Sequence, residues 1–152
     1  MIEEKEIATE HYKKLVEVLG KKNVPMKIES PFDFIYIANK GINVSAIENF
    51  ILYFNLSKSL VAQILDVSEP TLYRWTKANR NLERNFSVKL FEIVDLFLYG
   101  EEVFVDRDAF FKWLNLPNEA LGGLEPQELI EIPEGVSKVK DIIGRIEYGV
   151  YS

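Results

Sequence analysis

Apolar residues recur at helical spacing along almost the whole chain, and this pattern constrains the fold more than any other feature. The strict alternation that is typical of a half-buried strand hardly occurs. Glycine, proline and hydroxyl or acidic capping residues divide the pattern into segments of helical length. We expect helices at residues 3–19, 31–40, 46–55, 58–65, 69–77, 85–100, 107–115, 126–130 and 136–148. The sequence therefore predicts an all-α fold.

Capping residues fix several of the expected helix ends. Ser30 precedes Pro31, which is the usual order of an N-cap and the first helical residue. Ser45 and Asp106 are the expected N-caps of two further helices. Glycine favours a left-handed C-terminal cap, so we expect Gly100 to end the long helix that starts near residue 85.

Size and composition indicate an ordinary globular protein. The chain has 152 residues, of which 47% are hydrophobic and 28% are charged, enough for one domain or two small ones. It has no apolar run of about 18 residues, which argues against a membrane span. Its first residues form no apolar signal-peptide core, and it has no cysteine for disulfides or thiolate metal sites. These features predict a cytoplasmic protein.

Charge is distributed unevenly along the chain. The net charge is −6, which by itself argues against a nucleic-acid partner. Residues 57–90, however, hold six basic and three acidic side chains, a balance of +3. Residues 101–152 hold 11 acidic and five basic side chains, a balance of −6. A basic middle and an acidic final third indicate two surfaces with two different partners.

The stretch SLVAQILDVSEPTLYRW, residues 59–75, has the pattern of a helix-turn-helix unit. Ala62 supplies the small side chain that a close helix crossing needs. Asp66 occupies the turn, where a residue that tolerates a left-handed backbone is required. Ser68 is a suitable N-cap for the second helix, and Pro70 is tolerated in its first turn. The apolar positions that join the two helices are Val61, Leu65, Val67, Leu72 and Trp75.

The outward positions of this unit predict contact with DNA. If Leu72 and Trp75 face inward, the other side of the second helix is free to read base edges in a major groove. The alternative is a helical hairpin whose charges only face water. One such unit binds weakly, so a homodimer on a two-fold operator is expected. The expected base-reading residues are Ser68, Glu69, Thr71, Tyr73, Arg74 and Lys77, and the expected phosphate contacts are Lys58, Arg80 and Arg84.

No pattern of catalytic residues is present in the sequence. The only histidine, His11, lies in an acidic helix, and there is no cysteine nucleophile. The phosphate-binding glycine motifs are missing, and the pair Gly122-Gly123 lacks the lysine and hydroxyl residue that would follow in a phosphate loop. We therefore predict a binding protein with no catalytic residue, cofactor, metal site or small-molecule substrate.

The final third is a compact helical unit that resembles a known family. Trp113 and Leu114 are followed by PNEALGG, a proline-started helix PQELI, a Gly-x-x-x-Val pattern at residues 135–139, and GRIEYGVYS at residues 144–152. This order resembles the Xre/MbcA/ParS antitoxins of bacterial toxin–antitoxin pairs, and the resemblance extends over residues 41–152. Glu125 departs from the family, which usually has threonine before this proline.

The resemblance implies a division of the chain and a partner. It implies an N-terminal helical segment at residues 1–40, an Xre-like helix-turn-helix domain at 41–100, and a toxin-binding domain at 101–152. The implied partners are a RES-domain toxin that consumes NAD, whose active site the C-terminal domain occludes, and the operator DNA of the shared operon. The toxin-contacting positions that it implies are Arg145, Glu147, Tyr148, Tyr151 and Ser152.

Three alternatives remain open. Arg145 and Glu147 could contact neighbours in their own chain instead of a toxin, and the tyrosines could fold back onto their own domain. The whole protein could also be a stand-alone transcriptional regulator or localisation factor with another protein partner.

Overall fold

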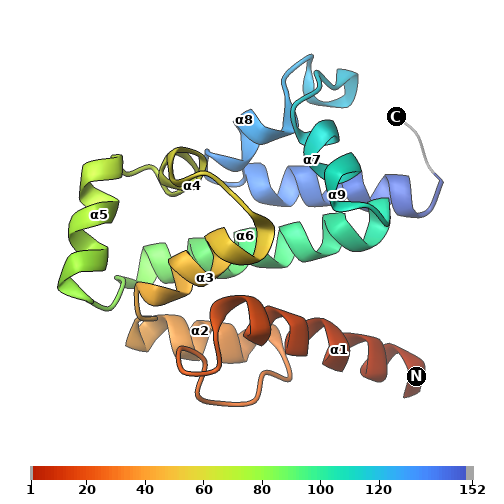
Figure 1. Cartoon of the computed structure of the whole chain (residues 1–152). Helices are drawn as coiled ribbons and strands as arrows, with labels where there is room; N and C mark the ends of the chain where they lie inside the picture. The colour runs from red at the N-terminus through yellow and green to blue at the C-terminus, as the bar shows by residue number, and fades with distance from the viewer. Residues whose placement is uncertain (1, 150–152) are drawn as a thin grey trace. The chain divides into compact units, whose positions relative to one another are not determined.

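The computed structural model describes residues 2–149, with side chains described from residue 10 onward, and within this range the fold is all-α, as predicted (Figure 1). The backbone of these residues forms no strand and makes only an isolated bridge between Asn43 and Asn81. None of the described helices has the length and apolar character needed to cross a membrane. The elements are α1 (Ile2–Leu19), α2 (Pro31–Lys40), α3 (Ser45–Phe54), α4 (Lys58–Leu65), α5 (Glu69–Ala78), α6 (Arg84–Phe104), α7 (Arg107–Leu114), the 3-10 turn η1 (Glu119–Leu121), α8 (Pro126–Ile130) and α9 (Gly135–Glu147).

The chain divides into two compact units, which are residues 1–94 and 95–152. The division falls within α6, so the first half of this helix belongs to unit 1 and the second half to unit 2. Helices α1 to α5 belong to unit 1, and α7 to α9 belong to unit 2.

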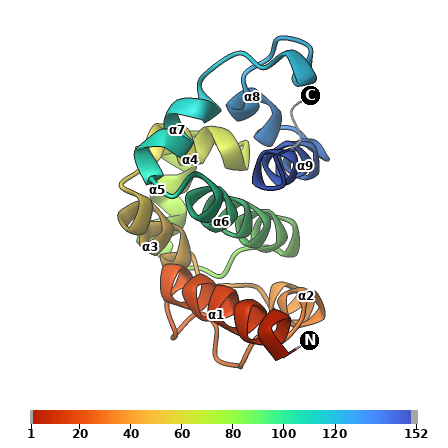
Figure 2. The same cartoon turned by 90° about the vertical axis from the view of Figure 1, so that its right-hand side faces the viewer.

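Unit 1 is held together by helices that share an aromatic and aliphatic core. The two N-terminal helices lie beside each other, as Figure 2 shows, and Phe34 of α2 links them to α6. Its ring is 5.4 Å from that of Tyr12 in α1 and 5.2 Å from that of Phe91 in α6. Phe50 and Phe54 of α3 are buried as well.

Backbone hydrogen bonds fasten the loop before α3 to the loop after α5. The N–H of Leu82 donates to the carbonyl of Ile42 at 2.7 Å, and the N–H of Ile42 donates to the buried Ser87 hydroxyl at 3.1 Å. Gly41 precedes this contact with φ +83°, and a Cβ there would lie 2.6 Å from the Leu82 carbonyl oxygen. Glycine is thus required on two counts, and the loops hold both ends of the α3–α5 segment in place.

Unit 2 is built around aromatic contacts between α7 and the second half of α6. The rings of Phe97 and Phe110 are 5.7 Å apart, and those of Phe104 and Trp113 are 5.3 Å apart. The expectation that Gly100 ends α6 is wrong, because the helix continues to Phe104. A Cβ on Gly100 would overlap the ring of Phe110, so this glycine permits close packing and does not stop the helix.

The junction between α8 and α9 is equally close. A Cβ on Gly135, the first residue of α9, would overlap the backbone carbonyl of Leu129. Beyond this point Val139 and Ile143 are fully buried and Ile142 nearly so, and they form the apolar face of the last helix. At Glu125 the Glu128 carboxylate accepts the backbone N–H at 2.8 Å, so α8 is capped without the threonine usual in the family.

The N-cap predictions at Ser30 and Asp106 are confirmed, and the N-cap prediction at Ser45 is wrong. The Asp106 carboxylate accepts the N–H of Asp108 at 2.9 Å, and α2 begins at Pro31 after Ser30. Ser45, by contrast, is the first residue of α3 and not its N-cap. The N-cap position of α3 is Val44, one residue earlier than predicted, and the Asn43 side chain accepts the Ser45 N–H at 2.9 Å.

Candidate functional site

The turn between α4 and α5 has the geometry that the sequence predicts. Asp66 adopts φ 56° and ψ 47°, the left-handed conformation expected of the turn residue. The N–H of Val67 donates to the Ala62 carbonyl at 3.0 Å, which draws the chain back across the end of α4. The Ser68 hydroxyl then accepts the N–H of Thr71 at 3.1 Å and caps α5.

The inner face of α5 is apolar and packs within unit 1. Leu72 is buried with 5% of its surface exposed. Trp75 is half-buried, and its ring meets that of Phe86 edge-on at 4.9 Å. Both residues therefore face inward, as the sequence pattern predicts, and the opposite face of α5 is left to solvent.

The outer face of α5 presents polar side chains that are held in place by their own helix. Glu69, Tyr73, Arg74 and Lys77 are exposed. The Arg74 guanidinium donates to the Thr71 hydroxyl oxygen at 3.0 Å, and the Ser68 hydroxyl donates to the same oxygen at 2.8 Å. These two hydrogen bonds restrain the Arg74 side chain in the free protein. A restrained side chain loses less entropy when it binds a partner.

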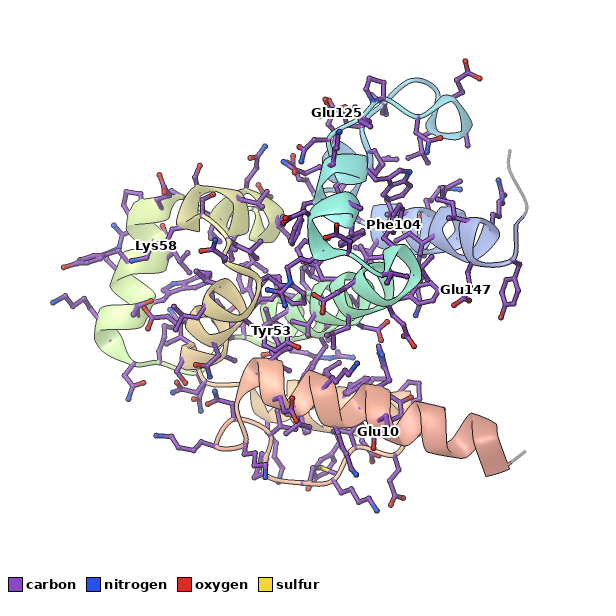
Figure 3. The ribbon with its side chains drawn as sticks, turned by 45° about the vertical axis from the view of Figure 1, so that its right-hand side comes forward. Glu10, Tyr53, Lys58, Phe104, Glu125 and Glu147 are labelled. Carbon is purple, nitrogen blue, oxygen red and sulfur yellow. The ribbon has the colours of Figure 1, made fainter. Side chains whose placement is uncertain are left out.

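A hollow of about 860 Å³ lies beside the outer face of α5, between it and α3. Ile47, Ile51 and Leu72 form its apolar part, and Lys58 approaches from the start of α4 (Figure 3). Glu48, Glu69, Arg74 and Lys77 also line it, so both signs of charge are present.

The remaining basic residues border this surface. Arg80 and Arg84 are exposed. The Arg80 guanidinium lies 5.3 Å from the centre of the Trp75 ring and 3.7 Å from the Glu83 carboxylate. The residues predicted to contact DNA thus lie on α4 and α5, in the turn between them, and from Arg80 to the start of α6 at Arg84, and all but Thr71 are exposed. Contact of these residues with DNA stays a prediction.

A second candidate surface lies in unit 2, where α9 runs alongside the second half of α6 in both views (Figures 1 and 2). The Lys140 ammonium donates to the Asp95 carboxylate at 2.8 Å, and the Tyr99 hydroxyl donates to the Glu147 carboxylate at 2.9 Å. Burial, and then this hydrogen bond and the Glu147 charge, raise the pKa of Tyr99 well above its ordinary value. The hydroxyl therefore stays protonated and able to donate at neutral pH.

The residues predicted to contact the toxin differ in whether their side chains are bound within their own chain. Glu147 is bound within its own chain, which was one of the alternatives left open, although its residue remains exposed. Arg145 is exposed on α9, and Tyr148, directly after the helix, is 80% exposed. Tyr151 and Ser152 lie outside the described residues.

Sequence reasoning missed the residues that hold α9 in place. Asp95 and Tyr99 are separated by 45 and 48 positions from the side chains that they bind. No local pattern marks such pairs. The only available signal is their spacing of four residues, which places both on one face of α6.

Unit 2 also exposes apolar side chains near its loops. Val105, between α6 and α7, is 89% exposed and has φ 65°, a conformation that β-branched residues rarely adopt. Leu116, Leu124 and Ile132 are about half exposed. Among the described side chains, from residue 10 to residue 149, no group of three or more histidine, cysteine, aspartate or glutamate residues is placed to hold a metal ion.

Comparison with known proteins identifies unit 2 more closely than its geometry does. Residues 100–149 match the family model described as the antitoxin Xre/MbcA/ParS C-terminal toxin-binding domain. A protein of Yersinia enterocolitica named Antitoxin Xre is 25% identical over 113 residues, which cover 74% of this chain and 76% of that protein. The Prs ADP-ribosylating antitoxin of a Sphingobium species is 24% identical over 132 residues, which cover 81% and 83%.

The fold has a counterpart among solved structures. A chain of the crystal structure of the MbcT–MbcA toxin–antitoxin complex of M. tuberculosis matches with a TM-score of 0.55 and 23% identity. The match covers 72% of this chain and 96% of that one. Nearly the whole of that smaller fold is therefore present here.

Proposed function

We propose that this chain, which belongs to the Xre/MbcA/ParS family of antitoxins, neutralises a cognate RES-domain toxin that consumes NAD by occluding its active site. The chain carries the C-terminal toxin-binding domain of that family at residues 100–149, and it is an antitoxin and not an enzyme. Its relatives extend the match well beyond that domain, since each spans about three quarters of the chain or more. The antitoxin is expected to act in the cytoplasm.

The observation that carries the docking proposal is the placement of Tyr148. Tyrosine is enriched at interfaces, because its ring offers a large apolar area and its hydroxyl a polar handle. Tyr148 is 80% exposed, yet it follows a helix end that is fixed by the hydrogen bond between Tyr99 and Glu147. A side chain presented from a fixed base loses little entropy on binding, which suits an anchor in a partner's pocket.

Charge supports the same partner. Residues 101–152 have a balance of −6, and an enzyme that binds NAD must accommodate its pyrophosphate with positively charged or N–H donor groups. An acidic domain therefore suits the mouth of such a site. Arg145, Tyr148, Tyr151 and Ser152 are the proposed contacts, and Glu147 is assigned to holding α9.

We further propose that α4 and α5 bind the operator of the toxin–antitoxin operon as part of a homodimer. The supporting observations are the left-handed turn at Asp66, the exposed polar face of α5 and the balance of +3 over residues 57–90. Arg74 and Lys77 are the proposed base contacts at the centre of that face. Lys58, Arg80 and Arg84 are the proposed phosphate contacts at its border.

A gel-shift titration with the operon's own promoter tests the DNA proposal. Replacing Arg74 and Lys77 together by alanine should lower the affinity at least tenfold, since each good base contact contributes about 1–3 kcal/mol. Lys138→Ala with Lys112→Ala is the matched control, because it removes the same number of charges from unit 2. Equal affinities of the double variant and the wild type would refute the assignment of α5.

A further inference from the structure

Helix α2 is apolar on two sides, although only one side packs against its own unit. Phe34, Ile37 and Ala38 face inward, where Phe34 meets the rings of α1 and α6. On the other side, Phe32 is 76% exposed and Tyr36 is 52% exposed.

The exposed apolar positions of α2 form a stripe. Phe32, Ile35 and Tyr36 are spaced at i, i+3 and i+4, which puts them on one face of the helix. Ile35 is 45% exposed. We call these three residues the α2 stripe. A helix whose outer side meets only water carries polar residues there, so the stripe indicates a partner.

The comparison with α9 shows how unusual this is within the molecule. The exposed positions of α9 between Ser137 and Glu147 are all polar or charged, and its apolar residues are buried or half-buried. Helix α9 is thus a regular amphipathic helix, and α2 is not. Two aromatic side chains on α2 that are more than half exposed leave on the order of 200 Å² of apolar surface in water.

Opposite charges lie at the two ends of the stripe. Glu29 precedes α2 and is exposed, and its contact with Lys27 at 3.5 Å joins two side chains that are both at least 70% exposed. Lys40 is the last residue of α2 and lies 4.7 Å from the centre of the Tyr36 ring. The helix dipole has its positive end beside Glu29 and its negative end beside Lys40.

We propose that the α2 stripe is the contact through which two copies of this chain pair, with their α2 helices antiparallel about a two-fold axis. Phe32 of each copy then packs on Tyr36 of the other, with Ile35 beside them. The same arrangement brings Glu29 of each copy to Lys40 of the other and sets the two helix dipoles head to tail. This inference rests on the proposal that the protein reads a two-fold operator, and it names the surface that forms the dimer.

A second copy fits the stripe because the stripe is complementary to itself. A two-fold contact needs one patch that matches its own rotated image. An aromatic residue near each end, an aliphatic residue between them, and unlike charges at the two ends meet that need. Unit 1 contains both the stripe and α5, so pairing and operator reading belong to the same unit.

The first test measures the mass of the full-length protein by light scattering after gel filtration, from about 1 to 100 µM. The wild type should be a dimer, and Phe32→Ser with Tyr36→Ser should raise its Kd more than a hundredfold, because each buried aromatic anchor is lost from both copies. Leu116→Ser, at a half-exposed leucine of unit 2, is the matched control and should leave the Kd unchanged. A wild type that is monomeric at 100 µM, or a double variant that still dimerises with the wild-type Kd, would overturn the proposal.

The second test depends on charge alone and does not alter the apolar surface. Glu29→Lys and Lys40→Glu should each weaken the dimer several-fold, because each places like charges together twice in a two-fold contact. The protein with both substitutions should recover most of the wild-type affinity. Two single variants that weaken the dimer without recovery in the combined variant would count against the antiparallel pairing.

Co-purification with the toxin shows whether the dimer proposal or the antitoxin proposal has failed. The Phe32→Ser and Tyr36→Ser variant should still co-purify with as much toxin per antitoxin chain as the wild type does. Its affinity for the operator should fall because the dimer is lost. Loss of toxin capture with an intact dimer would instead make the stripe a toxin contact and would overturn the dimer assignment. Failure of the wild type to bind any toxin would refute the antitoxin proposal and leave the dimer measurement unaffected.

Discussion

Helices α5 and α9 both end in exposed side chains, but they hold those side chains in different ways. In α5 the Arg74 guanidinium is bound by Thr71, three residues earlier in the same helix. In α9 the Glu147 carboxylate is bound by Tyr99, 48 residues earlier in α6. Where the exposed side chains are fixed by residues of their own helix, a short stretch of sequence is enough to predict their arrangement. Where they are fixed by another helix, their arrangement depends on how the whole unit folds. The α9 surface should therefore be the more sensitive of the two to substitutions elsewhere in its unit.

The largest effect should come from Gly135→Ala. A Cβ at this position would overlap the Leu129 carbonyl, which is backbone and cannot rotate away. We expect α9 to be displaced, with a loss of more than about 3 kcal/mol from the free energy of unfolding of unit 2. Toxin capture should be lost, and thermal unfolding followed by circular dichroism provides the stability measurement.

Gly144→Ala is the matched control within α9. Its Cβ would make only an ordinary contact, 3.5 Å from the Tyr99 hydroxyl, and alanine favours a helix by about 0.5–1 kcal/mol over glycine. A Gly135→Ala protein as stable as the wild type would show that the α8–α9 junction is looser than described here.

Tyr99→Phe should have the next largest effect. It removes one hydroxyl and leaves Glu147 without its donor, at a cost of about 1 kcal/mol for an exposed hydrogen bond to a charged group. Toxin affinity should fall about fivefold, measured by calorimetry, because Tyr148 loses its fixed base. An unchanged toxin affinity together with the expected loss of stability would show that the bond stabilises unit 2 without positioning Tyr148.

Val105→Gly tests a difference between the two units in which residue types adopt a positive φ. Unit 1 places Asn55, Asp66 and Asn79 in this conformation, which these residue types tolerate, whereas unit 2 places Val105 there with φ 65°. Glycine should stabilise unit 2 by about 1 kcal/mol because it relieves the contact between Cβ and backbone. Chemical denaturation provides the measurement, and Val105→Ala, which keeps the Cβ, should recover little of this gain.

Thr71→Val is the counterpart of Tyr99→Phe and should have the smallest effect. It removes the hydroxyl that orders Arg74 and keeps the shape of the side chain. Arg74 remains on the exposed face of α5 without this hydroxyl, and only the ordering of its side chain is lost. The operator affinity should therefore fall only about two- to threefold. A fall larger than that of the Arg74→Ala variant would mean that Thr71 contacts DNA itself.

The same contrast explains what the sequence could predict. The turn at Asp66, the cap at Ser68 and the exposed face of α5 follow from spacings of a few residues, and the structure agrees with each of them. The error at Gly100 arose because a glycine in sequence has two meanings, a helix stop or a close contact, and only the position of the Phe110 ring decides between them. The N-cap prediction at Ser45 was wrong because α3 already begins at Ser45, whose N–H donates to the Asn43 side chain.

The proposed toxin-binding surface could be predicted only through family resemblance. The motif from Trp113 to the tyrosines identified the domain, and the family match at residues 100–149 confirmed it. Periodicity alone predicted a helix at residues 136–148, without a partner. The pairs of Asp95 with Lys140 and of Tyr99 with Glu147 join residues too far apart in sequence for any local pattern to connect.

The central claim is that the end of the chain protects against the toxin while unit 1 binds DNA independently. The most direct measurement is the cellular NAD level when the proposed RES-domain toxin is co-expressed with the full chain or with a chain lacking residues 149–152. We predict that the full chain preserves NAD and that the shortened chain does not, while both bind the promoter with equal affinity. Full preservation of NAD by the shortened chain would contradict the claim.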